Sequence, residues 1–318
     1  MPQSMKVLVT GASGFVASHL LPELRKAGFS VRAASRKNVS IEGVEWVDCP
    51  ELNGSADWHE ALDGISAVIH LAGRAHVPSE TSGMDVERIY QRINADGTES
   101  LARQAAGAGV KHFLFMSSCH AVASESGTAL SDNTIPHPVT AYGRSKLAAE
   151  AAVRLAFDNA EGRFTIIRPP LVYGPGNLAN FARLIDLVRS GVPLPLGGIR
   201  NRRSFLGVGN LVNFVMTCLS RPAPDNRIFM PSDDEDVSTP ELIRQLAGCL
   251  GRKASLVSLP ESVLACCTRL PGLGILKKLT ASLYIDQQHV LAGLGWRPPL
   301  SLQDGLAFLS GKSGAVTS

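Results

Sequence analysis

The stretch VTGASGFVASHL, residues 9–20, leads from a short apolar run through two closely spaced glycines into an amphipathic segment. Because Gly11 and Gly14 lack side chains, a strand can turn tightly there and enter a helix. The backbone N–H groups of such a turn, together with the helix N-terminus, suit a pyrophosphate. Ala17 stands where a third small residue lets the helix pack closely on the strand, a task that alanine also performs. The stretch predicts a dinucleotide-binding turn, with a purely structural tight turn as the alternative.

Short apolar runs and helical patterns alternate along the first half of the chain. The runs KVLVT, SVRAAS, VEWVD, AVIHLAG, HFLFMSS and FTIIRPP predict strands, and helices are expected over HLLPELRKAG and around residues 86–107. These strands are apolar throughout rather than alternating, which is typical of a parallel sheet covered by helices on both faces. The sequence therefore predicts an α/β chain with a Rossmann-type doubly wound parallel sheet.

The pattern changes after Tyr173, where Gly and Pro punctuate GPGNLANF and GVPLPLGG. We expect residues 1–175 to form an NAD(P)-binding Rossmann domain, with a return segment near residues 204–235 that includes the apolar run IFMPS. Residues 176–203 and 236–318 are expected to form a smaller C-terminal α+β lobe that binds the substrate.

Charge and cysteine usage narrow the function classes. The 31 Lys and Arg residues nearly balance the 28 Asp and Glu residues, so the net charge of +3 is too diffuse to indicate a nucleic acid partner. The cysteines form no C-x-x-C pair and the histidines lack metal-ligand spacing, so we expect reduced thiols and no metal site.

The first residues show no signal peptide, and ESVLACCTRLPGLGILKKL is interrupted by Arg269 and Pro271, which favours a helix pair over a membrane segment. We expect a cytoplasmic protein without membrane insertion.

The end of the second expected strand bears on the choice of cofactor. An acidic residue at this place accepts hydrogen bonds from the adenosine ribose, but this chain has Ser35, followed by Arg36 and Lys37. A missing carboxylate and a nearby guanidinium suit a 2′-phosphate, so NADP(H) is favoured, with NAD(H) as the alternative. Arg36 and Lys37 could also form a solvated turn without a ligand.

A tyrosine and a lysine lie four residues apart in TAYGRSKLAAEAA. The spacing of Tyr142 and Lys146 places both side chains on one face of a helix. An ammonium near a phenol favours the phenolate, so we expect Lys146 to lower the pKa of Tyr142 and fit it for acid or base catalysis. Ser118, at the end of the fifth expected strand, can orient and polarise a carbonyl or carbinol oxygen. Because open α/β sheets bind ligands at this edge, the three residues predict a catalytic centre.

Taken in order, these motifs resemble the extended short-chain dehydrogenase/reductase family, in its nucleotide-sugar epimerase, dehydratase and reductase branch. TGASGF resembles the cofactor turn, HLAG a strand-four motif, NADGT a helix-four motif, YGRSK the catalytic pair and RPPLVYGPG the segment after strand six. The resemblance covers nearly the whole chain, in the right order.

The resemblance implies roles for individual residues. Tyr142 would be the acid/base, Lys146 the ribose-binding residue that tunes it, and Ser118 the catalytic serine. The residues implied to bind the cofactor are Gly11, Ser13, Gly14, Phe15, Val16, Ser35, Arg36, Asp48, Cys49, Leu71, Ala72, Gly73, Ser117, Tyr142, Lys146, Pro169 and Val172. The residues implied to bind the substrate are Arg74, Ser118, Cys119, His120, Tyr142, Asn180 and Arg203. Cys119 and His120 depart from the family's usual residues, which leaves the substrate contacts open.

The substrate lobe carries a basic run, GGIRNRRSFLGV, whose guanidinium groups suit a diphosphate. Taken alone, such a run is more often a solvated face. The resemblance matches Arg203 to an R-[DS]-[FY]-x-x-V segment that contacts the diphosphate of a nucleotide-sugar, and implies a second phosphate contact from Lys277 or Lys278.

Within this branch, PLPLGGIRNRRS followed by DVSTPELIRQL most resembles the subgroup that reduces UDP-4-keto-6-deoxy-N-acetylhexosamines for lipopolysaccharide O-antigen and other surface polysaccharides. The leading expectation is an oxidoreductase that acts at carbon 4 of a UDP-sugar with NADPH. The alternative is a UDP-hexose 4-epimerase, acting on UDP-glucose or UDP-N-acetylglucosamine with retained NAD. A non-catalytic NADP-binding regulator is the alternative of another class, which the complete acid/base set disfavours. Homodimers are common in the family, so a homodimer is expected.

Overall fold

The computed structural model of the chain describes residues 5–75, 83–177, 180–221, 226–259 and 280–310. At its centre lies a seven-stranded sheet in the order β3-β2-β1-β4-β5-β6-β9, in which every pairing is parallel. The strands are β1 (Lys6–Thr10), β2 (Ser30–Ala34), β3 (Val44–Val47), β4 (Ala67–His70), β5 (His112–Met116), β6 (Arg163–Ile167) and β9 (Arg227–Phe229). Strand order reverses between β1 and β4, and this reversal is where open α/β sheets bind ligands.

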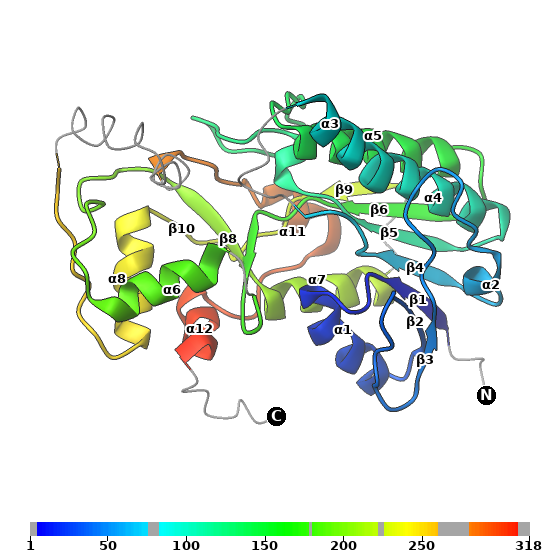
Figure 1. The fold of residues 1–318 in the computed structure, drawn as a ribbon, viewed down its shortest axis with the longest axis horizontal. Helices are drawn as coiled ribbons and strands as arrows, with labels where there is room; N and C mark the ends of the chain where they lie inside the picture. The colour runs from blue at the N-terminus through cyan, green and yellow to red at the C-terminus, as the bar shows by residue number, and fades with distance from the viewer. Residues whose placement is uncertain (1–4, 76–82, 178–179, 222–225, 260–279, 311–318) are drawn as a thin grey trace.

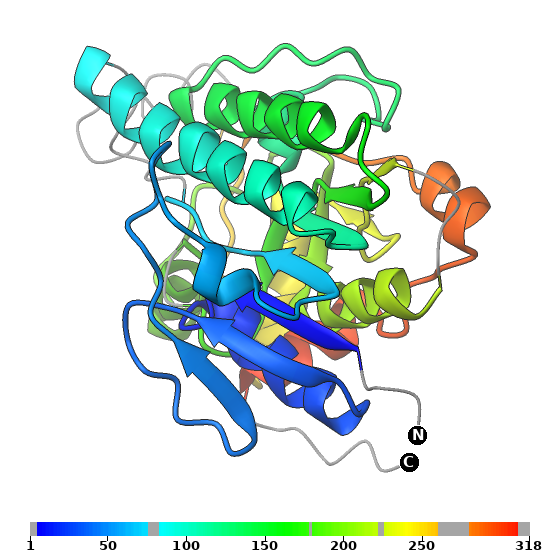
Figure 2. The ribbon, with the colours of Figure 1, turned by 90° about the vertical axis from the view of Figure 1, so that its right-hand side faces the viewer.

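Helices cover both faces of this sheet, as Figures 1 and 2 show. One face carries α1 (Phe15–Lys26), α7 (Val208–Ser220) and α11 (Gln288–Leu294), and the other carries α2 (His59–Leu62), α4 (Gly97–Gly107) and α5 (Ala141–Phe157). Successive strand residues point to opposite faces, so Val7 packs towards α1 while Leu8 packs towards α4 and α5. A short helix α3 (Met84–Tyr90) and a π-helical turn η1 (Gln91–Asp96) precede α4.

A second, three-stranded sheet lies beside the first. It pairs β8 (Arg203–Gly207) in parallel with β7 (Leu171–Tyr173) and antiparallel with β10 (Asp236–Val237). Its apolar side chains pack with those of α6 (Asn180–Ser190), α8 (Thr239–Cys249) and α12 (Leu302–Ala307), which is followed by the 3₁₀ turn η3 (Phe308–Ser310). This arrangement gives the chain a separate α+β lobe.

The predicted fold class, a doubly wound parallel sheet of Rossmann type, is confirmed. The domain boundaries stay a prediction. Within the expected return segment 204–235, α7 and β9 join the large sheet, whereas β8 belongs to the small one. Within the range 236–318 assigned to the lobe, α11 packs against α7 instead, since Val290 and Trp296 belong to the core beneath the large sheet.

Several sequence expectations fall outside the described residues, namely the helix pair around residues 261–279 and the phosphate contact from Lys277 or Lys278. Within the described ranges, no helix is both long and apolar enough to cross a membrane. In the same ranges, no group of three His, Cys, Asp or Glu side chains is placed to hold a metal ion.

Candidate active site

The glycine turn after β1 has the shape that a pyrophosphate requires. Gly11 has φ +68°, and a Cβ added there would lie 2.7 Å from the backbone nitrogen of Ala72. Gly14 is the N-cap of α1, and no described side chain caps the N–H groups of that first turn, which also holds no acidic residue. The uncapped N–H groups and the positive end of the helix dipole favour an anion at this place. Ala17 is only 1% exposed and packs into the core, as the packing interpretation of that position requires.

The ends of the neighbouring strands continue this edge towards the adenosine side. Ser35 follows β2 and is buried, its hydroxyl donates to the carbonyl of Lys37 at 2.5 Å, and the indole of Trp46 donates to its carbonyl at 3.1 Å. The exposed Arg36 side chain lies close enough to Cys49 to act on its pKa, which burial raises to about 11. This corner therefore has a buried serine and an exposed guanidinium, and its role in binding the ribose stays a prediction.

Three further predicted cofactor residues follow β4. Leu71 is half-buried, Ala72 is buried and its N–H donates to Thr10 Oγ1 at 3.3 Å. Gly73 has φ +158°, and a Cβ there would lie 2.9 Å from the amide oxygen of Asn94. Asn94 Oδ1 accepts from the backbone N–H of Arg74 at 2.7 Å, so the amide holds this loop in place. These contacts give Asn94 a structural role in this loop.

The three predicted catalytic side chains come together at the ends of β5 and α5. The Ser118 side chain lies close enough to the Tyr142 phenol to lower its pKa. Thr140 caps α5 by accepting from the N–H of Gly143 at 3.0 Å, which fixes where the helix and hence Tyr142 begin. Lys146 Nζ donates to the carbonyl of Met116 at 2.9 Å. Tyr142 and Lys146 lie 24 and 28 positions after Ser118 in the sequence, and the structure brings all three to the end of β5.

Burial controls the protonation of this centre. It raises the pKa of Tyr142 to about 12, and the hydrogen bond from Ser118 only partly offsets the rise. We expected Lys146 to lower that pKa, but the ammonium is directed to the Met116 carbonyl and the direction of the shift is the opposite. Burial also lowers the pKa of Lys146 to about 8, while the charge of Glu150 raises it. At neutral pH the centre therefore holds a phenol and, mostly, an ammonium.

A buried ion pair behind these residues was missed by the sequence analysis. Arg168 donates to both carboxylate oxygens of Glu150, at 2.9 and 2.6 Å, and the Ser117 hydroxyl donates to the same carboxylate at 2.5 Å. A signal for Glu150 was present, because it continues the four-residue spacing of Tyr142 and Lys146. Ser117 was predicted to neighbour the cofactor, whereas its hydroxyl in the structure points to Glu150.

The segment after β6 holds further residues that were predicted to bind the cofactor. Pro169 is buried, and its carbonyl accepts from the N–H of Cys119 at 3.0 Å. Val172 in β7 is half-buried, and its carbonyl accepts from the Asn177 side chain at 2.9 Å. On the adenosine side, Asp48 accepts from the N–H of Cys49 at 3.0 Å. In the glycine turn, Ser13 is exposed while Phe15 and Val16 are half-buried.

The predicted substrate residues lie around the mouth of the catalytic centre. The ring of Tyr142 is flanked by His120 at 6.2 Å and by Tyr90 at 5.9 Å between centroids, and the Arg74 guanidinium lies 5.7 Å from the Tyr90 ring. Tyr90 is fully buried and was not anticipated from the sequence. Asn180 begins α6, but its side chain lies outside the described part of the structure.

Of the basic run, Arg203 lies near the catalytic centre, since it is close to Cys119, the residue after Ser118. Arg203 is half-buried; burial lowers its pKa, and the Cys119 thiol lies near enough to oppose this shift. It donates to the carbonyl of Ala281 at 3.1 Å. A half-buried guanidinium at this place suits an anionic ligand such as a diphosphate.

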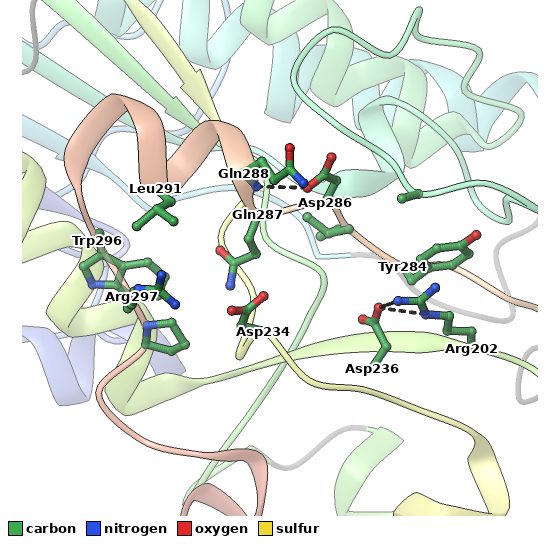
Figure 3. A pocket seen from close by; sticks show the side chains of 13 residues that line it. Arg202, Asp234, Asp236, Tyr284, Asp286, Gln287, Gln288, Leu291, Trp296 and Arg297 are labelled. Carbon is green, nitrogen blue, oxygen red and sulfur yellow. Dashed lines mark hydrogen bonds and ion pairs between the residues drawn. The ribbon is translucent and has the colours of Figure 1, made fainter.

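Arg202 instead lines a separate cavity of about 380 Å³ between the small sheet and α11, shown in Figure 3. Its guanidinium pairs with Asp236 at 2.9 Å and lies 4.4 Å from the ring of Tyr284. None of the residues predicted for cofactor or substrate is among the described residues that line this cavity. The solvated-face interpretation therefore suits Arg202 better than a role in the active site.

Comparison with known proteins agrees with this geometry. A family model described as the NAD dependent epimerase/dehydratase family matches residues 7–229. A UDP-glucose 4-epimerase of Vibrio cholerae is 36% identical over 314 residues, which cover 96% of this chain and 94% of that protein. The chain belongs to the NAD-dependent epimerase/dehydratase family. This confirms the resemblance that the motifs indicated, and with it an enzyme of the short-chain dehydrogenase/reductase type.

Other members of the family are similar over most of their length. An N-acetyl-alpha-D-glucosaminyl-diphospho-ditrans,octacis-undecaprenol 4-epimerase of Escherichia coli O157:H7 is 27% identical, over 80% of this chain and 75% of that protein. The structure of MoeE5 in complex with UDP-glucuronic acid and NAD has a TM-score of 0.77 and 28% identity, and covers 95% of this chain and 97% of its own. A UDP-glucuronic acid 4-epimerase from Bacillus cereus in complex with NAD, at 23% identity and TM-score 0.76, covers 95% and 94% and shares the fold.

Proposed function

We propose that this family member transfers hydride at carbon 4 of a UDP-sugar, with Ser118, Tyr142 and Lys146 as its catalytic residues. The observation that carries the proposal is the meeting of a buried Tyr142, Ser118 and a buried Lys146 at the edge of the sheet that also bears the glycine turn. A bound nicotinamide cofactor would supply the hydride chemistry. The relatives named above support the sugar class, because several are named as 4-epimerases of UDP-sugars or a related diphospho-sugar.

The protein's own groups would handle the proton and the charge. With its pKa raised to about 12, Tyr142 is protonated at neutral pH and is therefore ready to protonate a sugar oxygen. Ser118 lies close enough to act on the pKa of Tyr142, so the two hydroxyls can bind the same oxygen. The Lys146 ammonium stabilises the phenolate that remains after proton transfer. Arg203 would bind the diphosphate of the substrate.

For the overall reaction we propose a UDP-sugar 4-epimerase that keeps its nicotinamide cofactor bound through the cycle. The support is the UDP-glucose 4-epimerase of Vibrio cholerae, which is 36% identical along nearly the whole chain. An epimerase must protonate and deprotonate the same oxygen, and a single Tyr142 with its serine partner meets this requirement.

A specific observation also favours the second candidate, a 4-reductase of UDP-4-keto-6-deoxy-N-acetylhexosamines. Ser35 replaces the acidic residue that suits NAD, and Arg36 is exposed where a 2′-phosphate would lie. NADPH enters reduced and leaves oxidised, which matches a reductase and not an epimerase. The NAD-bound relatives support the epimerase instead, so the cofactor decides between the two.

The test supplies two groups of substrates to the purified chain. UDP-glucose, UDP-galactose and UDP-N-acetylgalactosamine are offered without added cofactor, and UDP-4-keto-6-deoxy-N-acetylglucosamine is offered with NADPH or NADH. Interconversion at carbon 4 without cofactor consumption supports the epimerase and excludes the reductase. Stoichiometric oxidation of NADPH gives the reverse result. Failure of every substrate would refute carbon-4 chemistry on UDP-sugars.

We further propose the homodimer expected for the family. We place the interface on the catalytic helix α5, whose exposed surface includes Leu155 at 79% exposure. Sedimentation of the wild type and of Leu155→Glu tests this, since a monomeric wild type would contradict it. The cytoplasmic location expected from the sequence stays a prediction.

A further inference from the structure

The ion pair of Glu150 and Arg168 is among the most deeply buried charged groups of the described chain. Both side chains are 1% exposed. The carboxylate accepts two hydrogen bonds from the guanidinium and a third from the Ser117 hydroxyl, so its oxygens are well satisfied. Nothing in the proposed chemistry uses this pair directly, because both side chains are buried.

The pair joins three segments that each carry part of the catalytic centre. Glu150 lies one helical turn beyond Lys146 on α5. Ser117 directly precedes Ser118 at the end of β5, and Arg168 directly precedes the cleft residue Pro169 at the end of β6. One side-chain cluster thereby ties α5, β5 and β6 together immediately behind the reacting groups.

Backbone hydrogen bonds continue the same connection. Ser117 N–H donates to the carbonyl of Ile167 at 2.8 Å, and Arg168 N–H donates to the carbonyl of Phe229 at 2.8 Å. Lys146 reaches the carbonyl of Met116, one residue before Ser117. A shift of Ser117 would therefore move Met116, whose carbonyl accepts from Lys146, and also Ser118.

Stability does not explain why this position holds charges. A fully buried ion pair recovers little more than the cost of removing both groups from water, and an apolar pair of similar volume often stabilises a fold equally well. The surrounding side chains of the α4 and α5 face are apolar and could accommodate such a pair, as Val153 and Ala149 show. Buried pairs that fix a geometry are the better-attested case.

We propose that Glu150 and Arg168 are positioning residues, which hold the Ser117–Ser118 backbone and Lys146 in the geometry that the catalytic centre requires. The catalytic part of this inference rests on the proposed function. Misplacement of reacting groups by about 1 Å can cost about 100-fold in rate. A contact that prevents such misplacement therefore explains why two charges are buried here. The charge of Glu150 additionally supports the Lys146 ammonium against burial.

The central experiment replaces both charges at once, with Glu150→Met and Arg168→Met in one variant. Single replacements would leave one buried charge uncompensated and unfold the chain, whereas the apolar pair should fold with a melting temperature close to that of the wild type. We expect kcat to fall about 100-fold with the KM for the UDP-sugar little changed. We expect NADH to bind about fivefold more weakly, as for one lost hydrogen bond, and ADP to bind as before.

The matched control is the ion pair of Lys111 and Glu161, at 2.8 Å, which lies at the opposite ends of β5 and β6 and is largely exposed. Lys111→Met with Glu161→Met removes an equal number of charges next to the same two strands. This variant should retain the kcat and the NADH affinity of the wild type. Equal losses in both double variants would show that any disturbance of these strands impairs activity, and would overturn the proposal.

Ser117→Ala covers the case in which the double variant fails to fold. It removes only the hydroxyl that links the pair to β5, and alanine fits the same space. We expect an unchanged melting temperature with a reduced kcat, and wild-type values of kcat and NADH affinity would overturn the proposal. If the wild type turns over none of the UDP-sugars, the proposed function fails, while the comparison of NADH and ADP affinities still decides the positioning role.

Discussion

The two ends of the candidate site are built in different ways. At the turn end, around Gly11 and Arg36, the groups offered to a ligand are backbone N–H groups and an exposed side chain. At the catalytic end, Ser118, Lys146 and Glu150 are between 1% and 7% exposed and are tied by hydrogen bonds. The turn end therefore depends on the local backbone and on free space, whereas the catalytic end depends on a buried network that several segments share.

This difference predicts how each end responds when a residue is substituted. A group in a shared network affects its partners when it is replaced, so effects at the catalytic end should be large and non-additive. At the turn end, a replacement acts only through the space or the charge that it alters at its own position. The predictions below test this contrast, and the largest expected effect comes first.

Tyr142→Phe removes the one hydroxyl proposed to exchange a proton with the sugar. We expect kcat to fall by about 10³, because general acid–base catalysis contributes roughly this factor. Cofactor affinity, measured by NADH fluorescence, should fall by much less. The control is Tyr90→Phe, whose ring packs against Tyr142 and whose hydroxyl donates to the carbonyl of Ala75 at 3.1 Å. Near-normal turnover by Tyr142→Phe would refute the assignment.

Gly11→Ala should be the most damaging small change at the turn end. The added Cβ would lie 2.7 Å from the Ala72 nitrogen, and φ +68° is strained for an L-residue by roughly 1–2 kcal/mol. We expect the affinity for NADH to fall by at least about tenfold, which this strain and the displaced loop together imply. Gly28→Ala is the control, since Gly28 has φ +85° with no described atom within 4 Å of the added Cβ. Equal affinity losses in both would show that general strain, and not the turn, is responsible.

The same contrast explains what the sequence could reveal. Gly11, Gly14 and the apolar strand runs act through local backbone preferences, so the turn and the parallel sheet were predictable and the sheet is confirmed. The meeting of Ser118 with Tyr142 could be anticipated because strand ends share one edge. The partners Arg168 and Glu150 could not, because their contact depends on the relative placement of β6 and α5.

The sign of the pKa shift of Tyr142 was wrong for the same reason. Spacing on a helix shows that Lys146 can face Tyr142, but it does not show how deeply both are buried or that the ammonium is held by the Met116 carbonyl. The proposed role of Arg203 in binding a diphosphate was easier to infer from the sequence, because it depended on the R-[DS]-[FY]-x-x-V motif. That Arg202 pairs with Asp236 instead required the fold.

The pH dependence of turnover and of stability tests the catalytic end through Lys146. Lys146 has a pKa of about 8 against an ordinary 10.5, so its ammonium is lost as the pH rises through 8. Turnover that needs the ammonium should fall above this pH. Between about pH 8 and 10.5 the unfolded chain holds more protons than the folded one, so the contribution of Lys146 to the free energy of unfolding should rise. Activity and the stability difference between wild type and Lys146→Met should therefore move in opposite directions. A pH-independent kcat up to pH 10 would contradict this.

Arg36→Asp tests the exposed corner of the turn end. A guanidinium that binds a 2′-phosphate contributes about 1.5–3 kcal/mol as a charged hydrogen bond, so the ratio of NADPH to NADH affinity should fall by at least about tenfold. The carboxylate can also accept from the ribose hydroxyls, which should improve NADH binding. The melting temperature should not change, because Arg36 is exposed. An unchanged affinity ratio would support the solvated-turn interpretation and a cofactor choice set elsewhere.

Ala17→Gly should have the smallest effect on the ligand, even though it restores the third glycine of the common dinucleotide motif. Ala17 is 1% exposed and contacts the core, so the substitution removes a buried methyl group and places glycine inside α1. We expect a loss of about 1–2 kcal/mol in the free energy of unfolding, and NADH affinity within twofold of the wild type. If the two ends differ as argued, the turn responds only to residues that face the phosphate, which are Gly11 and Gly14. A tenfold gain in affinity from Ala17→Gly would show instead that helix packing also limits the site.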